Sequence, residues 1–292
     1  MATKIKKYKI KSYAKINLSL DVIKIRKDGY HEIDTILHNI NNLYDEVEIT
    51  VSKNINNTKP HINVDCGNFS IPKKSNLAYK ACKLMCDTYN INDHLNIKIK
   101  KKIPLSSGLA GGSSNAASCI MALNKIYKLN LDDKKLCKIA QKIGADVSHF
   151  ILGGNTRARG FGEKLTKLNK FKMPVLLLAK AGKKSATKDI YKKIDMYKKD
   201  FGRININKIV KLLRNNDVRN ASLYMGNILE KAYSKNNKIR KIKNIMLESN
   251  AYYSSMSGAG PTVYGFFKNK KDARICLNKL KRSDKNIWVS IQ

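Results

Sequence analysis

The chain has 292 residues, 42% of them hydrophobic, which is enough for a substantial buried core and predicts two domains. Lys and Arg number 58 against 22 Asp and Glu, and because this net charge of +36 is scattered along the chain, we predict no specific nucleic-acid partner. No apolar run reaches the length of a membrane-spanning helix, about 18 residues, so we predict no membrane partner.

The first predicted strand alternates apolar and polar residues between Tyr8 and Val22. Period two places Lys15, Asn17 and Asp21 on one face, opposite the face that packs on the core. For Asp21 we expect a solvated position, whereas Lys15 and Asn17 could instead line a cleft. The next segment, residues 26–32, contains Asp-Gly, a turn signal that presents Tyr30 and His31 at the tip of a connection. By itself a Tyr-His pair is typical of an ordinary surface.

Residues 104–117, Pro-Leu-Ser-Ser-Gly-Leu-Ala-Gly-Gly-Ser-Ser-Asn-Ala-Ala, follow an alternating strand pattern and precede an apolar helical run. Gly108, Gly111 and Gly112 allow tight turns and close approach of a ligand to the backbone. Ser113 and Ser114 add hydroxyl groups at the start of the helix, where phosphate is a natural ligand. The segment matches neither a Walker A loop nor a dinucleotide fingerprint. A plain turn before a serine-capped helix is the alternative.

Asp146 follows a helix stop at Gly144 and enters an apolar stretch, where a carboxylate requires a partner or a function. A helix cap or a turn is the alternative. Further on we expect a strand at 175–179, helices near 205–214, 220–233 and 237–248, and a strand–glycine turn–strand unit at 252–266. Strands and helices mix in both halves, which predicts an α+β protein with domains at 1–165 and 166–292.

The six cysteines form no Cys-x-x-Cys pair, and no second Cys or His pair accompanies Cys82 and Cys86. We therefore predict reduced, mostly buried thiols and no zinc site.

Four segments in this order resemble the GHMP kinase superfamily: residues 14–18, 28–32, 104–117 and 144–147. Ala-Lys-Ile-Asn-Leu together with Asp-Gly-Tyr-His resembles the family within it that acts on 4-diphosphocytidyl-2-C-methyl-D-erythritol. Residues 160–163 and 256–263 match further glycine motifs of the superfamily. The resemblance implies an N-terminal domain like ribosomal protein S5 domain 2, a C-terminal ferredoxin-like domain and an active site in the cleft between them.

The resemblance also implies a reaction, transfer of the γ-phosphoryl group of ATP to the 2-hydroxyl of that substrate, in the non-mevalonate isoprenoid pathway. Asp146 corresponds to the base and Lys15 to its electrostatic partner. Asn17, Tyr30, His31 and Tyr191 correspond to substrate-binding residues, and the two tyrosines are expected to stack on either side of the cytosine. The ATP-binding residues implied are Pro104, Ser106, Gly108, Leu109, Ala110, Gly111, Gly112, Ser113 and Ser114.

ATP with Mg²⁺ is the implied cofactor, and only Ser113 or Ser114 suggests itself as a protein ligand of the metal. Two dipeptides depart from the family pattern: Ser148-His149 replaces Pro-Phe, and Lys183-Lys184 replaces less charged residues. We expect a monomer or homodimer in the cytoplasm, with a plastid-like organelle as the alternative. Other GHMP kinases, of homoserine or mevalonate type, and a basic RNA-binding protein are the alternative functions.

Overall fold

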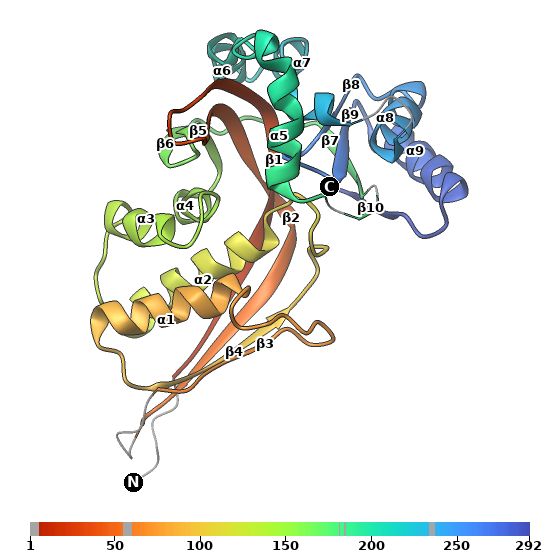
Figure 1. The fold of residues 1–292 in the computed structure, drawn as a ribbon. Helices are drawn as coiled ribbons and strands as arrows, with labels where there is room; N and C mark the ends of the chain where they lie inside the picture. The colour runs from red at the N-terminus through yellow and green to blue at the C-terminus, as the bar shows by residue number, and fades with distance from the viewer. Residues whose placement is uncertain (1–5, 55–59, 181, 184, 234–236) are drawn as a thin grey trace. The chain divides into compact units, whose positions relative to one another are not determined.

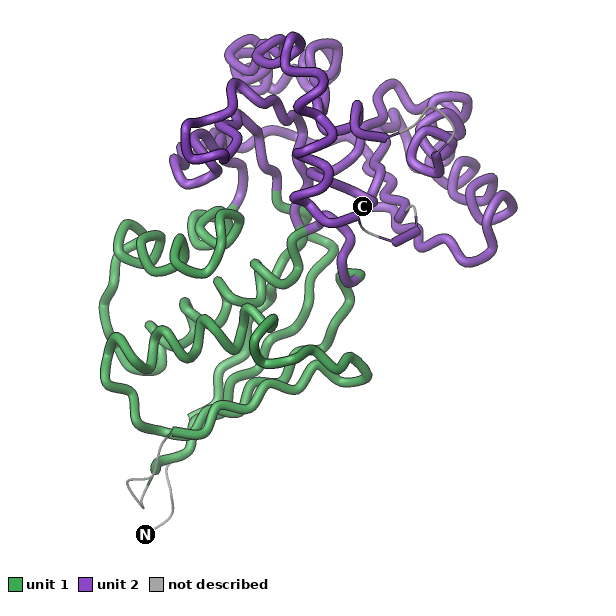
Figure 2. The backbone as a smooth tube through the Cα atoms, in the orientation of Figure 1, with its two compact units in different colours: residues 1–14, 39–104, 110–153 green, residues 15–38, 105–109, 154–292 purple. Residues whose placement is uncertain are grey.

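The computed structural model of the chain describes residues 6–54, 60–180, 182, 183, 185–233 and 237–292. It contains two compact units (Figure 2): unit 1 comprises residues 1–14, 39–104 and 110–153, and unit 2 comprises residues 15–38, 105–109 and 154–292. Strands β1 (Lys6–Ile25) and β2 (His31–Ser52) contribute residues to both units, so no single cut of the chain separates them. The predicted boundary after residue 165 falls within strand β6 (Lys164–Leu168) and stays a prediction.

Unit 1 is built on a sheet to which β3 (Ile62–Asp65) and β4 (His94–Lys100) contribute. β4 pairs antiparallel with β2, and β3 pairs parallel with β4. Helices α1 (Leu77–Tyr89) and α2 (Gly111–Ile126) lie side by side across one face of these strands (Figure 1). The apolar side chains of β4 pack there against both helices, so the alternation predicted for this strand is confirmed. The unit also contains α3 (Asp133–Gln141) and α4 (Val147–Leu152).

In unit 2, β5 (Asn155–Gly160) pairs with β2 and with β6. A separate antiparallel sheet has the order β10-β7-β9-β8. In chain order its elements follow the pattern βαββαβ, which is a ferredoxin-like arrangement and confirms the predicted C-terminal domain type. Its strands are β7 (Val175–Lys180), β8 (Tyr253–Met256), β9 (Thr262–Phe267) and β10 (Trp288–Ile291). The helices of the unit are α5 (Thr187–Ile194), η1 (Asp195–Asp200), α6 (Ile206–Arg214), α7 (Val218–Ser222), η2 (Ile228–Ala232), α8 (Lys238–Glu248) and α9 (Lys270–Ser283).

The prediction of a single helix near residues 220–233 is wrong, because the structure has the short helix α7 and the 3-10 helix η2 in its place. Gly226 and Asn227 lie in the non-helical segment between these two helices. The carbonyl oxygen of Gly226 accepts a hydrogen bond of 2.8 Å from the N–H of Leu20 in β1. The side chain of Asn227 caps η2 by accepting a bond of 3.0 Å from the N–H of Leu229. Backbone pairing with a distant strand thus overrides the local helical pattern.

The prediction that Asp21 is solvated is also wrong, because its side chain is fully buried. One carboxylate oxygen accepts from the N–H of Val22 and the other from the N–H of Ile204, each at 2.8 Å. Burial raises the pKa of Asp21, and these backbone hydrogen bonds oppose that effect. The polar face of β1 is therefore an internal face, whose polar groups are satisfied by hydrogen bonds rather than by water.

A buried ion pair in unit 1 joins the segment after β4 to strand β2, and a side chain of helix α2 is hydrogen-bonded to both partners. The side chains of Lys101 and Asp45 are 4% and 0% exposed, and the Lys101 ammonium donates to the Asp45 carboxylate. The amide of Asn115 in α2 donates to the same carboxylate at 3.0 Å and accepts from Lys101 at 3.0 Å. Asp45 also accepts from the backbone N–H groups of Lys102 and Ile103. The network fixes the start of the glycine-containing loop relative to α2.

We expect Lys101→Met to lower the free energy of unfolding by about 3 kcal/mol, since it leaves a buried carboxylate without its cation. The matched control is Lys102→Met, because Lys102 pairs with Glu46 in an exposed salt bridge and its loss should have no measurable effect. Urea unfolding of the three proteins measures the difference. Equal midpoints for Lys101→Met and Lys102→Met would contradict this role of the buried pair.

Candidate functional site

The predicted strand, glycine loop and helix are confirmed as β4, residues 101–110 and α2. Three loop residues have a left-handed backbone, Ser106 with φ 51°, Gly108 with φ 83° and Ala110 with φ 56°. Ala110 is the residue that caps α2, and it provides no side-chain hydrogen bond to the helix. The alternative of a serine-capped helix is therefore wrong. The first N–H groups of α2 receive no side-chain cap, which is the condition for binding an anion there.

Gly108 is required by its contacts as well as by its backbone angle. A Cβ atom at this position would lie 2.7 Å from the carbonyl oxygen of Ser257 and 2.8 Å from that of Gly260. The Ser257 hydroxyl donates to the carbonyl oxygen of Gly108 at 3.2 Å, and the N–H of Thr262 donates to that of Ser107 at 3.1 Å. Loop residues 105–109 therefore contact the C-terminal glycine turn, residues 257–260, within unit 2.

Lys15 and Asn17 lie beside the same turn. Lys15 is only 4% exposed, and its N–H donates to the carbonyl oxygen of Leu109 at 3.1 Å. Its ammonium donates to the side-chain oxygen of Asn17 at 2.7 Å. A Cβ atom on Gly258 would lie 3.2 Å from that oxygen and 3.7 Å from the Lys15 Nζ atom. The arrangement fixes an ammonium group beside the two glycine segments, where it can neutralise an anion.

Two further residues, which the sequence did not suggest, hold the C-terminal turn in place. The amide nitrogen of Asn227 donates to the carbonyl oxygens of Met256 and Gly258, each at 2.8 Å. The hydroxyl of Tyr233 donates to the carbonyl oxygen of Ala259 at 2.9 Å. Asn227 lies in the segment for which an uninterrupted helix was expected, so no local signal marked it.

His31 and Tyr191, both predicted to bind substrate, lie together in unit 2 with ring centroids 4.8 Å apart. The Nε2 atom of His31 is 2.7 Å from an Asp195 carboxylate oxygen, a partner that the sequence did not indicate. Tyr30 follows the predicted turn, in which Gly29 has φ 78°, and its side chain is 66% exposed. The stacking of a base between Tyr30 and Tyr191 stays a prediction.

Asp146 belongs to unit 1, as does the start of α2. It lies in a turn at the N-cap position of α4, as the alternative expected, but its carboxylate makes no capping hydrogen bond to that helix. Ser148 and His149, which follow Asp146 and depart from the family pattern, are buried and hydrogen-bonded within unit 1. The Ser148 hydroxyl donates to the carbonyl oxygen of Cys137 at 3.2 Å, and the Nε2 atom of His149 is 2.7 Å from the side-chain oxygen of Asn39. Both replacements therefore pack into the interior.

The two serines at the start of α2 differ in environment. The hydroxyl of Ser114 is buried and accepts a hydrogen bond of 2.8 Å from that of Ser12, whereas Ser113 is half-buried. Within the described ranges, no group of three or more His, Cys, Asp or Glu side chains could hold a metal ion. The six cysteines are free thiols, five of them buried, as predicted.

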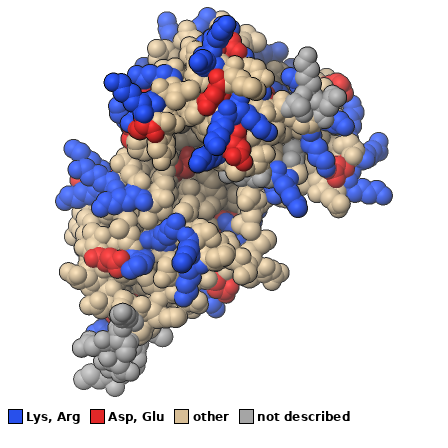
Figure 3. Space-filling view, viewed as in Figure 1, with Lys and Arg blue, Asp and Glu red and all other residues tan. Residues whose placement is uncertain are grey.

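Two observations concern the predictions made above about membrane and nucleic-acid partners. In the described part of the chain, no helix has the length and apolarity needed to cross a membrane. On the face shown in Figure 3, Lys and Arg side chains are widely spread and interspersed with acidic ones, and they form no continuous basic stripe there. This scatter matches the distribution along the sequence.

Comparison with known proteins agrees with these motifs. Residues 76–154 match the GHMP kinases N terminal domain, and residues 209–286 match the GHMP kinases C terminal domain. The 4-diphosphocytidyl-2-C-methyl-D-erythritol kinase of Clostridium novyi (strain NT) is 40% identical over 282 residues, covering 96% of this chain and 98% of that protein.

A crystal structure of 4-(cytidine 5'-diphospho)-2C-methyl-D-erythritol kinase matches with a TM-score of 0.79 and 27% identity, covering 97% of this chain and 98% of the other. The homoserine kinase of Cytophaga hutchinsonii matches with a TM-score of 0.69 over 97% of this chain and 94% of the other, but at 19% identity it shares the fold alone. With identity of this extent along nearly the whole of both sequences, the chain belongs to the 4-diphosphocytidyl-2-C-methyl-D-erythritol kinase family of the GHMP kinases.

Proposed function

We propose that this protein transfers the γ-phosphoryl group of ATP to the 2-hydroxyl of 4-diphosphocytidyl-2-C-methyl-D-erythritol, giving ADP and the 2-phosphate. The observation that carries the proposal is the near full-length similarity to the kinase of Clostridium novyi that bears this substrate's name. The proximity of Lys15 and Asn17 to loop residues 105–109 within unit 2 supports the proposal. Cytoplasmic localisation and a monomeric or dimeric state stay predictions.

The phosphates of ATP are proposed to bind at the start of α2 and along the preceding loop. The first turn of α2, which includes Gly111 and Gly112, directs backbone N–H groups and the positive end of the helix dipole outward. A Cβ atom on Gly112 would meet only the Leu77 side chain, at the ordinary contact distance of 3.8 Å. Nothing within the described chain therefore requires glycine at this position, which is expected if a ligand does.

Mg²⁺ bound to the phosphates would neutralise charge as the γ-phosphoryl group moves between oxygens. Of the two serines at the start of α2, we propose Ser113 as the metal-binding residue. The Ser114 hydroxyl is buried and occupied by its hydrogen bond with Ser12, whereas a half-buried hydroxyl fits an oxygen-preferring cation that keeps most of its water ligands.

The acceptor hydroxyl is proposed to lose its proton to Asp146, with the Lys15 ammonium stabilising the negative charge that develops on the oxygen. Asn17 supports this role, because its side-chain oxygen fixes the ammonium and its amide in turn donates to Thr35 at 2.9 Å. An ammonium held in place before the reaction loses little entropy on binding the charged transition state. Asn17 is also the proposed contact to the substrate.

The cytidine is proposed to bind at the aromatic cluster of His31 and Tyr191, with Tyr30 as a second stacking surface. The exposed ring of Tyr30 offers a flat face to a base, and stacking contributes about 1–3 kcal/mol per base. Asp195 holds the His31 ring through a bond of 2.7 Å, so the ring has a fixed orientation toward a ligand.

The substrate assignment is tested by offering ATP with one acceptor at a time: the cytidyl substrate, homoserine or mevalonate. A coupled assay for ADP and phosphorus NMR of the product report the reaction. We expect turnover with the cytidyl substrate alone and a new phosphate monoester at its 2-oxygen. Turnover with homoserine or mevalonate would favour another GHMP kinase activity, and no turnover with any acceptor would refute the proposed function.

Asp146→Asn keeps the shape of the side chain but removes its basicity. We expect kcat to fall by about 10²–10⁴, the usual contribution of a positioned base, with the Kd for ATP nearly unchanged because the loop and α2 hold the nucleotide. The control is Asp87→Asn, an exposed residue of α1 that pairs with Lys83 and should leave kcat unchanged. Turnover close to wild type in folded Asp146→Asn protein would exclude a catalytic role for this carboxylate.

A further inference from the structure

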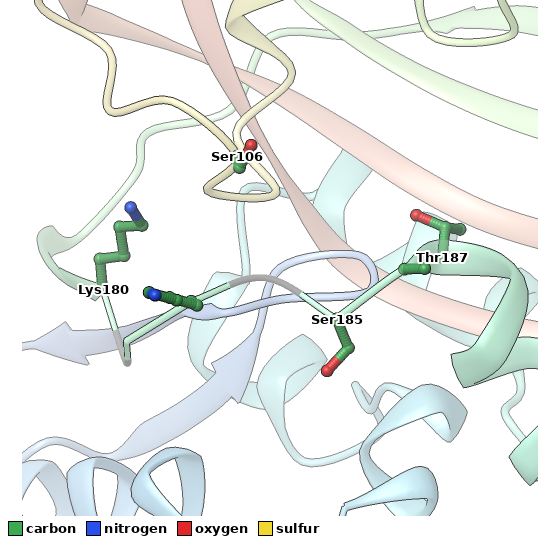
Figure 4. Close-up of a pocket in the computed structure, with 6 residues that line it drawn as sticks. Ser106, Lys180, Ser185 and Thr187 are labelled. Carbon is green, nitrogen blue, oxygen red and sulfur yellow. The ribbon is translucent and has the colours of Figure 1, made fainter.

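Unit 2 contains a pocket of about 540 Å³, and of its lining residues only Ser106 belongs to the site residues named so far (Figure 4). Its volume lies in the range of small-molecule sites. Its walls come from the end of β7, the connection that follows it, the start of α5 and Ser106 of the glycine loop. The lining residues are Ser106, Lys180, Lys183, Ser185, Ala186 and Thr187.

The lining carries two positive charges and no negative one. Lys180 is the last residue of β7, where its backbone is fixed between Trp288 of β10 and Thr262 of β9. Figure 4 shows its side chain extending from the end of the strand toward the side of the pocket where Ser106 lies. Among the described residues, neither Lys180 nor Lys183 forms a salt bridge with a carboxylate, unlike many other lysines of this chain. Two uncompensated ammonium groups at one pocket attract an anion.

Neutral donors complete the pocket. Ser106, with its left-handed backbone, and Thr187 present hydroxyl groups. Ala186 caps α5 without a side-chain hydrogen bond, so the first N–H groups of this helix also lack a side-chain acceptor. Ser185 lies beside the hydroxyl of Tyr233, which donates to the carbonyl oxygen of Ala259 in the C-terminal glycine turn. The pocket wall is thereby tied to the segment that lies beside Lys15.

We propose that Lys180 and Lys183 form an anion subsite that binds the di- or triphosphate group of a substrate. Lysine binds phosphate as a flexible point charge, and hydroxyl and backbone donors add directed hydrogen bonds. The proposal rests on the proposed function, in which both substrates carry such a group: the triphosphate of ATP and the diphosphate of the cytidyl substrate. Lys183 also belongs to the Lys-Lys pair that departs from the family pattern, so the subsite is a property of this chain; Lys184 lies outside the described residues.

The test compares Lys180→Met, Lys183→Met and the double variant with Lys192→Met, which removes an exposed lysine of α5 outside the pocket. Calorimetric titration measures the Kd of ATP, of the cytidyl substrate and of inorganic pyrophosphate separately. We expect the double variant to weaken pyrophosphate and at least one substrate by about ten-fold, the usual effect of losing a hydrogen bond to a charged group. Lys180→Arg should retain most of the affinity, and Lys192→Met should change nothing.

The substrate whose affinity falls identifies the phosphate group that the subsite holds. Unchanged affinities in the folded double variant, or an equal loss in Lys192→Met, would overturn the proposal. Thermal unfolding monitors the fold, and the exposed Lys183→Met variant decides the question if changes at Lys180 destabilise β7. The pyrophosphate titration does not depend on catalysis. A wild-type protein that binds pyrophosphate through these lysines but phosphorylates no acceptor would refute the proposed function and leave the subsite standing.

Discussion

The close contact between two glycine segments determines the geometry of the site in unit 2. Loop residues 105–109 approach the turn 257–260 so closely that a single Cβ atom on Gly108 would lie 2.7 Å from a carbonyl oxygen. In the same loop, the carbonyl oxygen of Leu109 accepts a hydrogen bond from the N–H of Lys15. Because backbone atoms of three distant segments fix one another, the Lys15 ammonium and the loop that leads into α2 have defined positions before any ligand binds. Preorganisation of this kind is what phosphoryl transfer requires of a protein.

Buried polar side chains hold these backbone segments in place through hydrogen bonds. Asn227 holds the C-terminal turn through two carbonyl oxygens, and Asn115 and Asp45 hold the start of the glycine loop in unit 1. Apolar residues could fill the same space, but they would leave the carbonyl and N–H groups of irregular loops unsatisfied. Several buried polar side chains therefore lie where irregular backbone approaches the proposed ligands. The same logic explains the buried Asp21, whose carboxylate accepts backbone N–H groups from two segments.

The sequence predicted the features that depend on local pattern. Alternation identified β4 and placed Lys15 and Asn17 on one face, and the glycine spacing identified the loop before α2. Alternation could not show that the polar face of β1 is buried, because several of its partners, such as Ile204 for Asp21, lie far away in the sequence. For the same reason Asn227, Asp195 and the Lys101 ion pair left no local signal. That Lys180 and Lys183 line one pocket, with no carboxylate among its described lining residues, could be recognised only from the structure.

Under the proposed function, a bound phosphate rather than the fold requires glycine at position 112, whereas the fold requires it at position 108. Calorimetric titration of ATP into Gly112→Val, with Gly108→Ala as the comparison and thermal unfolding of both variants recorded alongside, separates the two requirements. We expect Gly112→Val to unfold near the wild-type temperature and to bind ATP at least about ten-fold more weakly, a change of about 1.4 kcal/mol, whereas Gly108→Ala should lose stability. Wild-type ATP affinity in folded Gly112→Val protein would mean that no phosphate of ATP binds against this glycine.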